Sequence, residues 1–213
     1  MKPIGILGGT FDPVHHGHLR LAIECIERLA LAEVRLVPLR VPPHRKPPRA
    51  SPEHRLAMLK LATANKNNLI VDDSELRRKD ISYTIDTVSA LRKNSGRTPL
   101  CLLMGTDAFN MLHTWHRWQS LLDYVHIVIA ERPGVVCTPE NAELNSVLVK
   151  HTAMDPTALH TAENGRIFRV QIPWLDISAT RIRDMLRMRH NTSFLLPEAV
   201  IDYIHTHGLY AGT

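Results

Sequence analysis

Two histidines and two glycines near the beginning of the chain have the types and spacing that phosphate binding requires. They stand in the segment Gly8-Gly9-Thr10-Phe11-Asp12-Pro13-Val14-His15-His16-Gly17-His18. Glycine lets a backbone or a phosphate come close where a side chain would clash. His15 and His18 are three residues apart, so they share one face if a helix begins there. Because a helix N-terminus favours anions, the segment predicts a polyphosphate site, although histidines that only cap the helix would show the same pattern.

The residues on either side of this segment predict the elements that hold it. Ile4 to Leu7 is an apolar run that is typical of a short buried strand. After the segment, apolar residues repeat at helical spacing, at Leu19, Ala22, Ile23, Ile26 and Leu29. The segment is therefore a turn from a strand into a helix, with Pro13 expected at the helix entry. Its spacing excludes both a Walker loop and the GxGxxG turn of dinucleotide-binding proteins.

A segment near the C-terminus, Ile177 to Arg183, predicts a second phosphate contact. Ser178 or Thr180 can cap the helix that follows, and Thr180 and Arg183 lie on one face of it. A hydroxyl and a guanidinium at a helix start bind phosphate oxygens, whereas a capped surface helix is the plainer interpretation.

Three further stretches carry polar or aromatic residues next to predicted strands. The loop 41–49 is rich in proline and basic residues, and it follows the strand predicted at 34–39. Ligands of open parallel sheets bind at the carboxyl ends of strands, so the loop is predicted to clamp an anion rather than to be merely solvated. Asp107 follows the apolar run 100–104 and can bind ribose hydroxyls or cap a helix. The stretch 115–118 holds two tryptophans, which indicate either packing or stacking on a flat ring.

The first segment resembles the HxGH signature of the nucleotidyltransferase superfamily, in the longer form found in its adenylyltransferase branch. The C-terminal segment resembles the ISSTxxR motif of the same superfamily, with Ala179 in place of the second serine. The resemblance covers essentially the whole chain and is closest to the bacterial nicotinate-mononucleotide adenylyltransferases. It implies that ATP and nicotinate mononucleotide are converted to nicotinate adenine dinucleotide and pyrophosphate, a step of NAD biosynthesis.

The resemblance also implies roles for individual residues. At one of these positions the chain departs from the family, because some relatives carry Tyr where this chain has His116. Catalysis is expected from His15, His18 and Arg183. ATP is expected to contact Gly8, Gly9, Thr10, Phe11, His18, Gly105, Asp107, Arg132, Ile177, Ser178, Thr180 and Arg183. The mononucleotide is expected to contact Thr10, His44, Arg45, Tyr83, Thr84, Trp115 and His116, with Trp115 stacked on the pyridine ring.

The implied reaction requires little acid–base catalysis by the protein. The attacking phosphate oxygen is already ionised near neutral pH, so no general base is needed. The protein must hold two polyanions in line and stabilise charge on the α-phosphorus and on the leaving pyrophosphate. Mg²⁺ is expected to travel with the ATP phosphates, keeping water and substrate oxygens as ligands, so no metal-binding residue is predicted.

Length and composition suit a single α/β domain over 1–213, with 44% hydrophobic and 22% charged residues. We expect a Rossmann-like, doubly wound parallel sheet of five to six strands with helices on both faces, and an inserted helix and loop region at 135–165. The three scattered cysteines favour a reducing compartment, and neither a signal peptide nor a membrane span is predicted. We therefore expect a cytoplasmic enzyme.

Two other functions fit part of the sequence. The formal charge of +5 suits anionic substrates, but it also suits a nucleic-acid-binding module. No basic helix stripe or RNA-binding aromatic motif supports that module, so no nucleic-acid partner is expected. A phosphopantetheine-type adenylyltransferase of the same superfamily is the nearer alternative, although its members are typically shorter. The oligomeric state is not indicated by the sequence.

Overall fold

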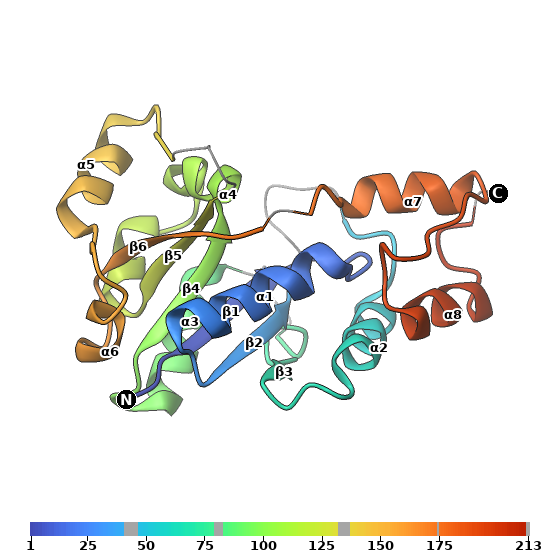
Figure 1. Ribbon diagram of the computed structural model, residues 1–213, viewed down its shortest axis with the longest axis horizontal. Coiled ribbons are helices and arrows are strands. Elements are labelled where there is room, and N and C mark those ends of the chain that lie inside the picture. Colours follow the sequence, from blue (N-terminus) through green and yellow to red (C-terminus); the bar gives the residue numbers. More distant parts are fainter. Residues whose placement is uncertain (41–46, 79–82, 132–136, 174, 212–213) are drawn as a thin grey trace.

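A six-stranded, all-parallel sheet forms the centre of the computed structural model, which describes residues 1–40, 47–78, 83–131, 137–173 and 175–211. The strand order is β3-β2-β1-β4-β5-β6, as Figure 1 shows. The strands are β1 (Ile4–Gly9), β2 (Glu33–Pro38), β3 (Leu69–Val71), β4 (Leu100–Gly105), β5 (His126–Glu131) and β6 (Ile167–Gln171). The expected fold class and number of strands are therefore confirmed.

The chain order reverses between β1 and β4, which lie side by side at the centre of the sheet. Strand β1 pairs with β2 from Ile4 opposite Glu33 to Gly9 opposite Pro38. It pairs on its other side with β4, where Ile4 lies opposite Leu100. In open parallel sheets, ligands bind beyond the carboxyl ends of the strands at such a reversal point. The glycine- and histidine-rich turn follows β1 and therefore lies at this point.

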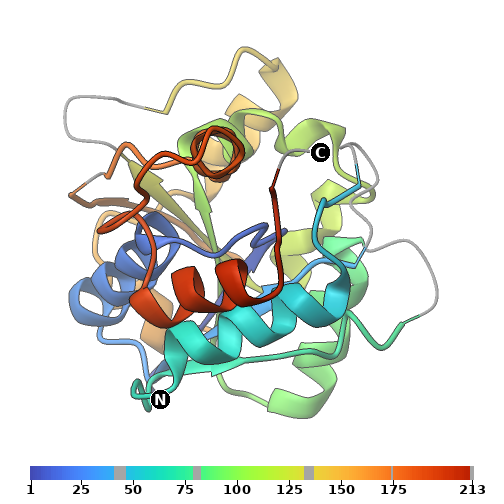
Figure 2. The ribbon, with the colours of Figure 1, turned by 90° about the vertical axis from the view of Figure 1, so that its right-hand side faces the viewer.

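Helices cover both faces of the sheet and enclose two apolar layers. One layer receives buried side chains from α1 (His16–Leu29), α2 (Pro52–Thr63), α6 (Ala158–Thr161), α7 (Ala179–Arg187) and α8 (Glu198–Thr206). The other receives them from α3 (Thr84–Ser95), α4 (Thr106–Asn110), α5 (Ala142–His151) and the 3₁₀ turns η1 (Leu112–Thr114) and η2 (Trp118–Asp123). Figure 2 shows α2 and α8 side by side on the first face. Strands β4 and β5 are buried along nearly their whole length, as a central position requires.

Two local expectations need correction. Helix α1 begins at His16 with His15 as its N-cap, so Pro13 lies in the turn before the helix and not at its first position. The spacing of Trp115 and Trp118 predicts that they share a helix face, but Trp115 follows η1 and Trp118 begins η2. Trp118 is buried in the core, whereas Trp115 is only partly buried.

The segment between β5 and β6 forms the connection in which an inserted region was expected. Helix α5 buries Leu144 and Leu148 in one apolar layer, and α6 buries Leu159 in the other. The structure thus describes two short helices here, each packed on the body of the domain. None of the helices in the described part of the chain combines the length and apolar character that a membrane span requires.

Candidate active site

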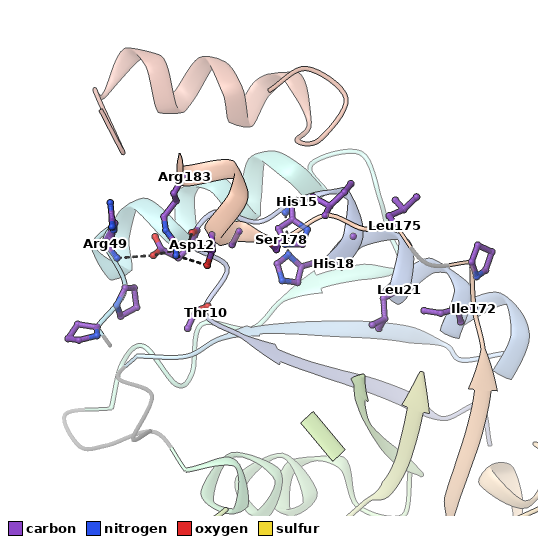
Figure 3. Close-up of a pocket in the computed structure, with 17 residues that line it drawn as sticks. Thr10, Asp12, His15, His18, Leu21, Arg49, Ile172, Leu175, Ser178 and Arg183 are labelled. Carbon is purple, nitrogen blue, oxygen red and sulfur yellow. Dashed lines mark hydrogen bonds and ion pairs between the residues drawn. The ribbon is translucent and has the colours of Figure 1, made fainter. Parts of the chain in front are cut away.

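A cavity of about 610 Å³ opens beside the turn that follows β1 (Figure 3). Its walls come from this turn, from the start of α1, from residues 47–49 and from residues 172–183. Thr10, Arg49 and Arg183 lie at one end, and Leu21 and Ile172 lie at the other (Figure 3). The cavity is large enough for a nucleotide, and it combines a polar end with an apolar end, as ligand sites commonly do.

The two predicted histidines lie in contact on the wall of this cavity. Their rings are stacked with centroids 3.7 Å apart. The backbone N–H of His15 donates to Nδ1 of His18 over 3.3 Å. Since Nδ1 is an acceptor, the neutral ring of His18 carries its proton on Nε2, which is left to donate to a ligand. The edge of the His18 ring is supported by Phe11, whose ring centroid is 5.0 Å away.

Burial keeps both imidazoles uncharged at neutral pH. Desolvation, and then electrostatic repulsion from the neighbouring His16 ring, lowers the pKa of His15 to about 4. Desolvation, and then electrostatic repulsion between the protonated forms of His18 and His15, also lowers the pKa of His18 well below its ordinary value. Nδ1 of His15 is buried and has no hydrogen-bond partner in the described part of the chain. The site therefore offers neutral hydrogen-bonding groups until an anion enters.

The N-terminus of α1 is less open to an anion than the sequence suggested. The backbone N–H of His16, the first of the helix, donates to the carbonyl of Leu195 over 3.0 Å. The N-terminus of helix α7 is a better candidate for anion binding. Its N-cap Ser178 accepts the N–H of Arg181 over 3.2 Å, and Ala179 and Thr180, the first residues of the helix, line the cavity.

Arg183 is fixed above the cavity by the turn and by its own helix. Its Nη1 donates to the backbone carbonyl of Asp12 over 2.7 Å and lies 3.7 Å from the Asp12 carboxylate. Its Nη2 donates to Oγ1 of Thr180 over 3.0 Å. The hydroxyl of Thr180 therefore orients the guanidinium, and the two predicted residues act as one unit.

Glycines at two positions make room for these aromatic rings. A Cβ on Gly17 would lie 3.0 Å from Nδ1 of His15, and one on Gly9 would lie 3.1 Å from the Phe11 ring. Gly8 differs, because among the described residues a Cβ there would meet only Leu39, at 4.0 Å. Gly9 and Gly17 thus permit the packing of the site itself, whereas Gly8 faces open space.

The predicted residues fall into two groups in space. Thr10, His15, His18, Ile177, Ser178, Thr180 and Arg183 line the cavity. Tyr83 and Trp115 pack instead against the apolar layer on the opposite face of the sheet. There the ring of Tyr83 lies 4.4 Å, between centroids, from that of His116. Thr84 begins α3, and Gly105 and Asp107 lie where β4 passes into α4. Ser82, His44, Arg45 and Arg132 lie outside the described residues.

Sequence reasoning missed three residues that hold the site together. Asp12 lies in the segment from Gly8 to His18, but no function was predicted for it. Its buried carboxylate accepts hydrogen bonds from the backbone N–H groups of Arg49 and Ala50 and from the hydroxyl of Tyr210. Arg55 is fully buried and donates to the carbonyls of Thr10 and Leu39 over 2.8 and 2.7 Å. The only local signal was an acidic residue within a phosphate-binding turn, because the partners of Asp12 lie 37 to 198 residues along the chain.

The described side chains contain no group of three or more His, Cys, Asp or Glu residues able to hold a metal ion. Asp12 is the carboxylate on the cavity wall, and both of its oxygens already accept backbone N–H groups.

The fold and the cavity define a nucleotide-binding α/β protein, and comparison with known proteins agrees. Residues 6–185 match the model of the cytidylyltransferase-like family. A protein of Aeromonas salmonicida, named a probable nicotinate-nucleotide adenylyltransferase, is 48% identical over 98% of this chain and 97% of its own. A protein of Methylococcus capsulatus with the same name is 46% identical over 98% of this chain and 99% of its own.

Solved structures show the same fold at low identity. The nicotinic acid mononucleotide adenylyltransferase of Plasmodium falciparum, complexed with NaAD, superposes with a TM-score of 0.71 at 19% identity, covering 99% of this chain and 98% of that one. The chain therefore belongs to the cytidylyltransferase-like family, within its group of nicotinate-nucleotide adenylyltransferases.

Proposed function

We propose that this protein transfers the adenylyl group of ATP to nicotinate mononucleotide, producing nicotinate adenine dinucleotide and pyrophosphate. The observation that carries the proposal is the cavity wall itself. It brings two neutral imidazoles, the Arg183 guanidinium and the start of α7 together beside the reversal point of the sheet. The names of relatives that are 46–48% identical over nearly the whole chain support the choice of substrates.

In the proposed reaction a phosphate oxygen of the mononucleotide attacks the α-phosphorus of ATP, and the bond to the β-phosphate breaks. No residue has to remove a proton, because the attacking oxygen is already ionised. Negative charge grows on the α-phosphate and on the leaving pyrophosphate. Nε2–H of His18, Arg183 and the N–H groups at the start of α7 stabilise that charge, assisted by Thr10 and Ser178. His15, whose ring stacks on His18 and which lines the same cavity, is proposed to contribute to this stabilisation.

The mononucleotide is proposed to reach from this cavity across the reversal point. Its pyridine ring would lie near Tyr83, Trp115 and His116, on the other side of the sheet, with Thr84 contributing an N–H group. We assign Gly105 and Asp107 to ATP, together with Arg132, with Gly8 and Gly9 at the end of β1, and with Phe11 in the turn that follows. His44 and Arg45, in the loop after β2, are proposed to bind the phosphate of the mononucleotide. Mg²⁺ is proposed to arrive on the ATP phosphates, so chelation should abolish turnover without unfolding the protein.

Release of pyrophosphate from ATP tests the proposal directly. The acceptors to compare are nicotinate mononucleotide, nicotinamide mononucleotide and phosphopantetheine, with an acceptor-free control. We expect release with the first, less with the second, and none with phosphopantetheine or without an acceptor. Release with phosphopantetheine alone would overturn the choice of acceptor, and no release with any acceptor would overturn the reaction. We place this reaction in the cytoplasm, which agrees with the three free, buried cysteines of the described chain.

A further inference from the structure

We propose that Tyr210, close to the C-terminus, is a positioning residue for this reaction: its phenol holds Asp12, which in turn holds Arg183 and the backbone of residues 49–50 on the rim of the cavity. The proposal rests on the function proposed above. It assigns a task to the last segment of the chain, which lies beyond the family match at residues 6–185.

The backbone after α8 carries the Tyr210 ring into the interior of the protein. Gly208 and Tyr210 both have positive φ, 58° and 63°, and the second is an uncommon conformation for a residue with a side chain. The ring is 9% exposed and belongs to the apolar layer that includes α1 and α8. At its far end the hydroxyl donates to Oδ1 of Asp12 over 2.7 Å. The strained backbone is thus accompanied by a specific polar contact beneath the cavity.

Asp12 joins the three chain segments that meet at this end of the cavity. Its Oδ1 accepts the N–H of Ala50 over 3.0 Å, and its Oδ2 accepts the N–H of Arg49 over 2.8 Å. Arg183 approaches Oδ2 and donates to the backbone carbonyl of the same residue. Removing the bond from Tyr210 would let the carboxylate turn about its side-chain torsions. A shift of Asp12 would therefore displace both Arg183 and the 49–50 backbone.

The phenol of Tyr210 is suited to this task because it stays protonated. Burial and the negative charge of Asp12 both raise the pKa of Tyr210, against smaller opposing effects of Arg183 and Arg55. The hydroxyl therefore donates throughout the working pH range and never competes with Asp12 as an anion. Tyr210 belongs to the apolar layer, so a purely structural role would require only that the ring be kept.

The substitution Tyr210→Phe removes the oxygen and keeps the ring. Tyr203→Phe is the matched control, because Tyr203 lies on α8 and its hydroxyl is 3.0 Å from Nδ1 of His54, away from the cavity wall. We expect Tyr210→Phe to lower kcat for pyrophosphate release about tenfold, the scale of one lost hydrogen bond in a site. The KM for ATP should change by less than about threefold, and Tyr203→Phe should retain wild-type kcat. Circular dichroism of each variant at the assay temperature verifies that it is folded.

A double-mutant cycle with Asp12→Asn shows whether Tyr210 acts through Asp12. If it does, Tyr210→Phe costs little further activity once Asp12 has been replaced, so the two effects are not additive. Wild-type kcat in Tyr210→Phe, equal losses in both tyrosine variants, or full additivity in the cycle would each overturn the proposal. An inactive wild type would overturn the proposed function as well, whereas an active wild type with an unaffected Tyr210→Phe would overturn this inference alone.

Discussion

One hydrogen bond at the start of α1 determines which ring nitrogen of His18 carries the proton. Because the backbone N–H of His15 occupies Nδ1, the proton of the neutral ring stays on Nε2 and faces the ligand. The stacked His15 ring and the edge of Phe11 then limit the rotation of His18. The ring is therefore oriented before a substrate binds, which is the arrangement that stabilises a transition state most effectively.

We expect His18→Ala to lower turnover by about 10²-fold or more, the scale of losing one transition-state donor. The KM for ATP should rise much less, because the other phosphate contacts remain. His16→Ala is the matched control, since His16 stands on the same turn but does not line the cavity. Steady-state kinetics of pyrophosphate release measures both quantities. A variant with wild-type turnover and weak ATP binding would show that His18 is a ground-state ligand.

The depressed pKa of His15 makes stability depend on pH in a definite direction. Its pKa is about 4 in the folded protein against 6.5 for an unperturbed ring. Above pH ~6.5 the ring is neutral in both states and contributes no dependence. As the pH falls towards 4, the unfolded chain takes up a proton that the folded protein does not, so stability declines. At pH 4 this amounts to about 3 kcal/mol.

Urea unfolding of wild type and of His15→Asn at pH 7 and near pH 4 measures this dependence. The wild type should lose more stability between the two pH values than the variant, by about 3 kcal/mol. Groups that do not interact with His15 contribute the same dependence to both proteins, whereas the effect of His15 on the pKa of His18 is lost together with the ring. Parallel pH profiles would show that His15 can be protonated in the folded state.

At the scale of elements, the sequence predicts features that depend on neighbouring residues and misses contacts between residues that are far apart in the chain. Strand β1, helix α1 and the Ser178 cap follow from apolar spacing and from residue types within a few positions. The roles of Asp12 and Tyr210 could not be predicted, because they depend on contacts between residues that folding alone brings together. The course of η1 and η2 was also missed, since two tryptophans at helical spacing fit one helix as well as two short turns.

Gly17 shows how a single position in α1 serves the site and not the helix. Alanine favours a helix over glycine by up to about 1 kcal/mol, so Gly17→Ala should leave the free energy of unfolding unchanged or slightly higher. Its Cβ would nevertheless lie 3.0 Å from Nδ1 and 3.1 Å from Cε1 of His15. The ring must move, and we expect kcat to fall at least tenfold, since small displacements of a catalytic group are costly.

Urea unfolding and pyrophosphate release, measured on the same preparation, separate these two effects. Gly8→Ala is the companion variant, because its Cβ would meet only Leu39, at 4.0 Å, and distorts nothing in the described chain. Any loss of activity in Gly8→Ala therefore reports contact with a ligand. Wild-type kcat in Gly17→Ala would mean that the position of the His15 ring does not matter for turnover.

At the scale of the whole molecule, the sheet separates two groups of predicted residues and presents both at its carboxyl edge. The residues proposed to bind phosphate lie with α1 and α7 on one face. Tyr83 and Trp115 lie on the other. Alternation of apolar runs with helical spacing predicts this architecture, because parallel strands need crossovers and the crossovers are right-handed. The contact between Tyr83 and His116 was not predicted, although both residues were singled out.

This arrangement predicts how the enzyme discriminates between nicotinate mononucleotide and nicotinamide mononucleotide. Nicotinate and nicotinamide differ by an oxygen in place of an amide nitrogen. N–H groups near Thr84 and His116 would form charge-assisted hydrogen bonds with the carboxylate. The amide NH₂ would leave such donors unpaired, at a cost of ~1–3 kcal/mol each. Two donors correspond to a preference for the acid of about 10²-fold or more, because about 1.4 kcal/mol is a factor of ten.

Trp115, which is partly buried, is expected to stack on the ring and not to contact the carboxylate. Trp115→Ala should therefore raise the KM for both mononucleotides by a similar factor and leave that for ATP nearly unchanged. Trp118→Phe, in the core three residues further on, is the matched control and should alter neither. The measurement is kcat/KM for each mononucleotide in the wild type and in both variants. Equal use of acid and amide by the wild type would refute the donor argument, and an unaffected Trp115→Ala would assign Trp115 to packing alone.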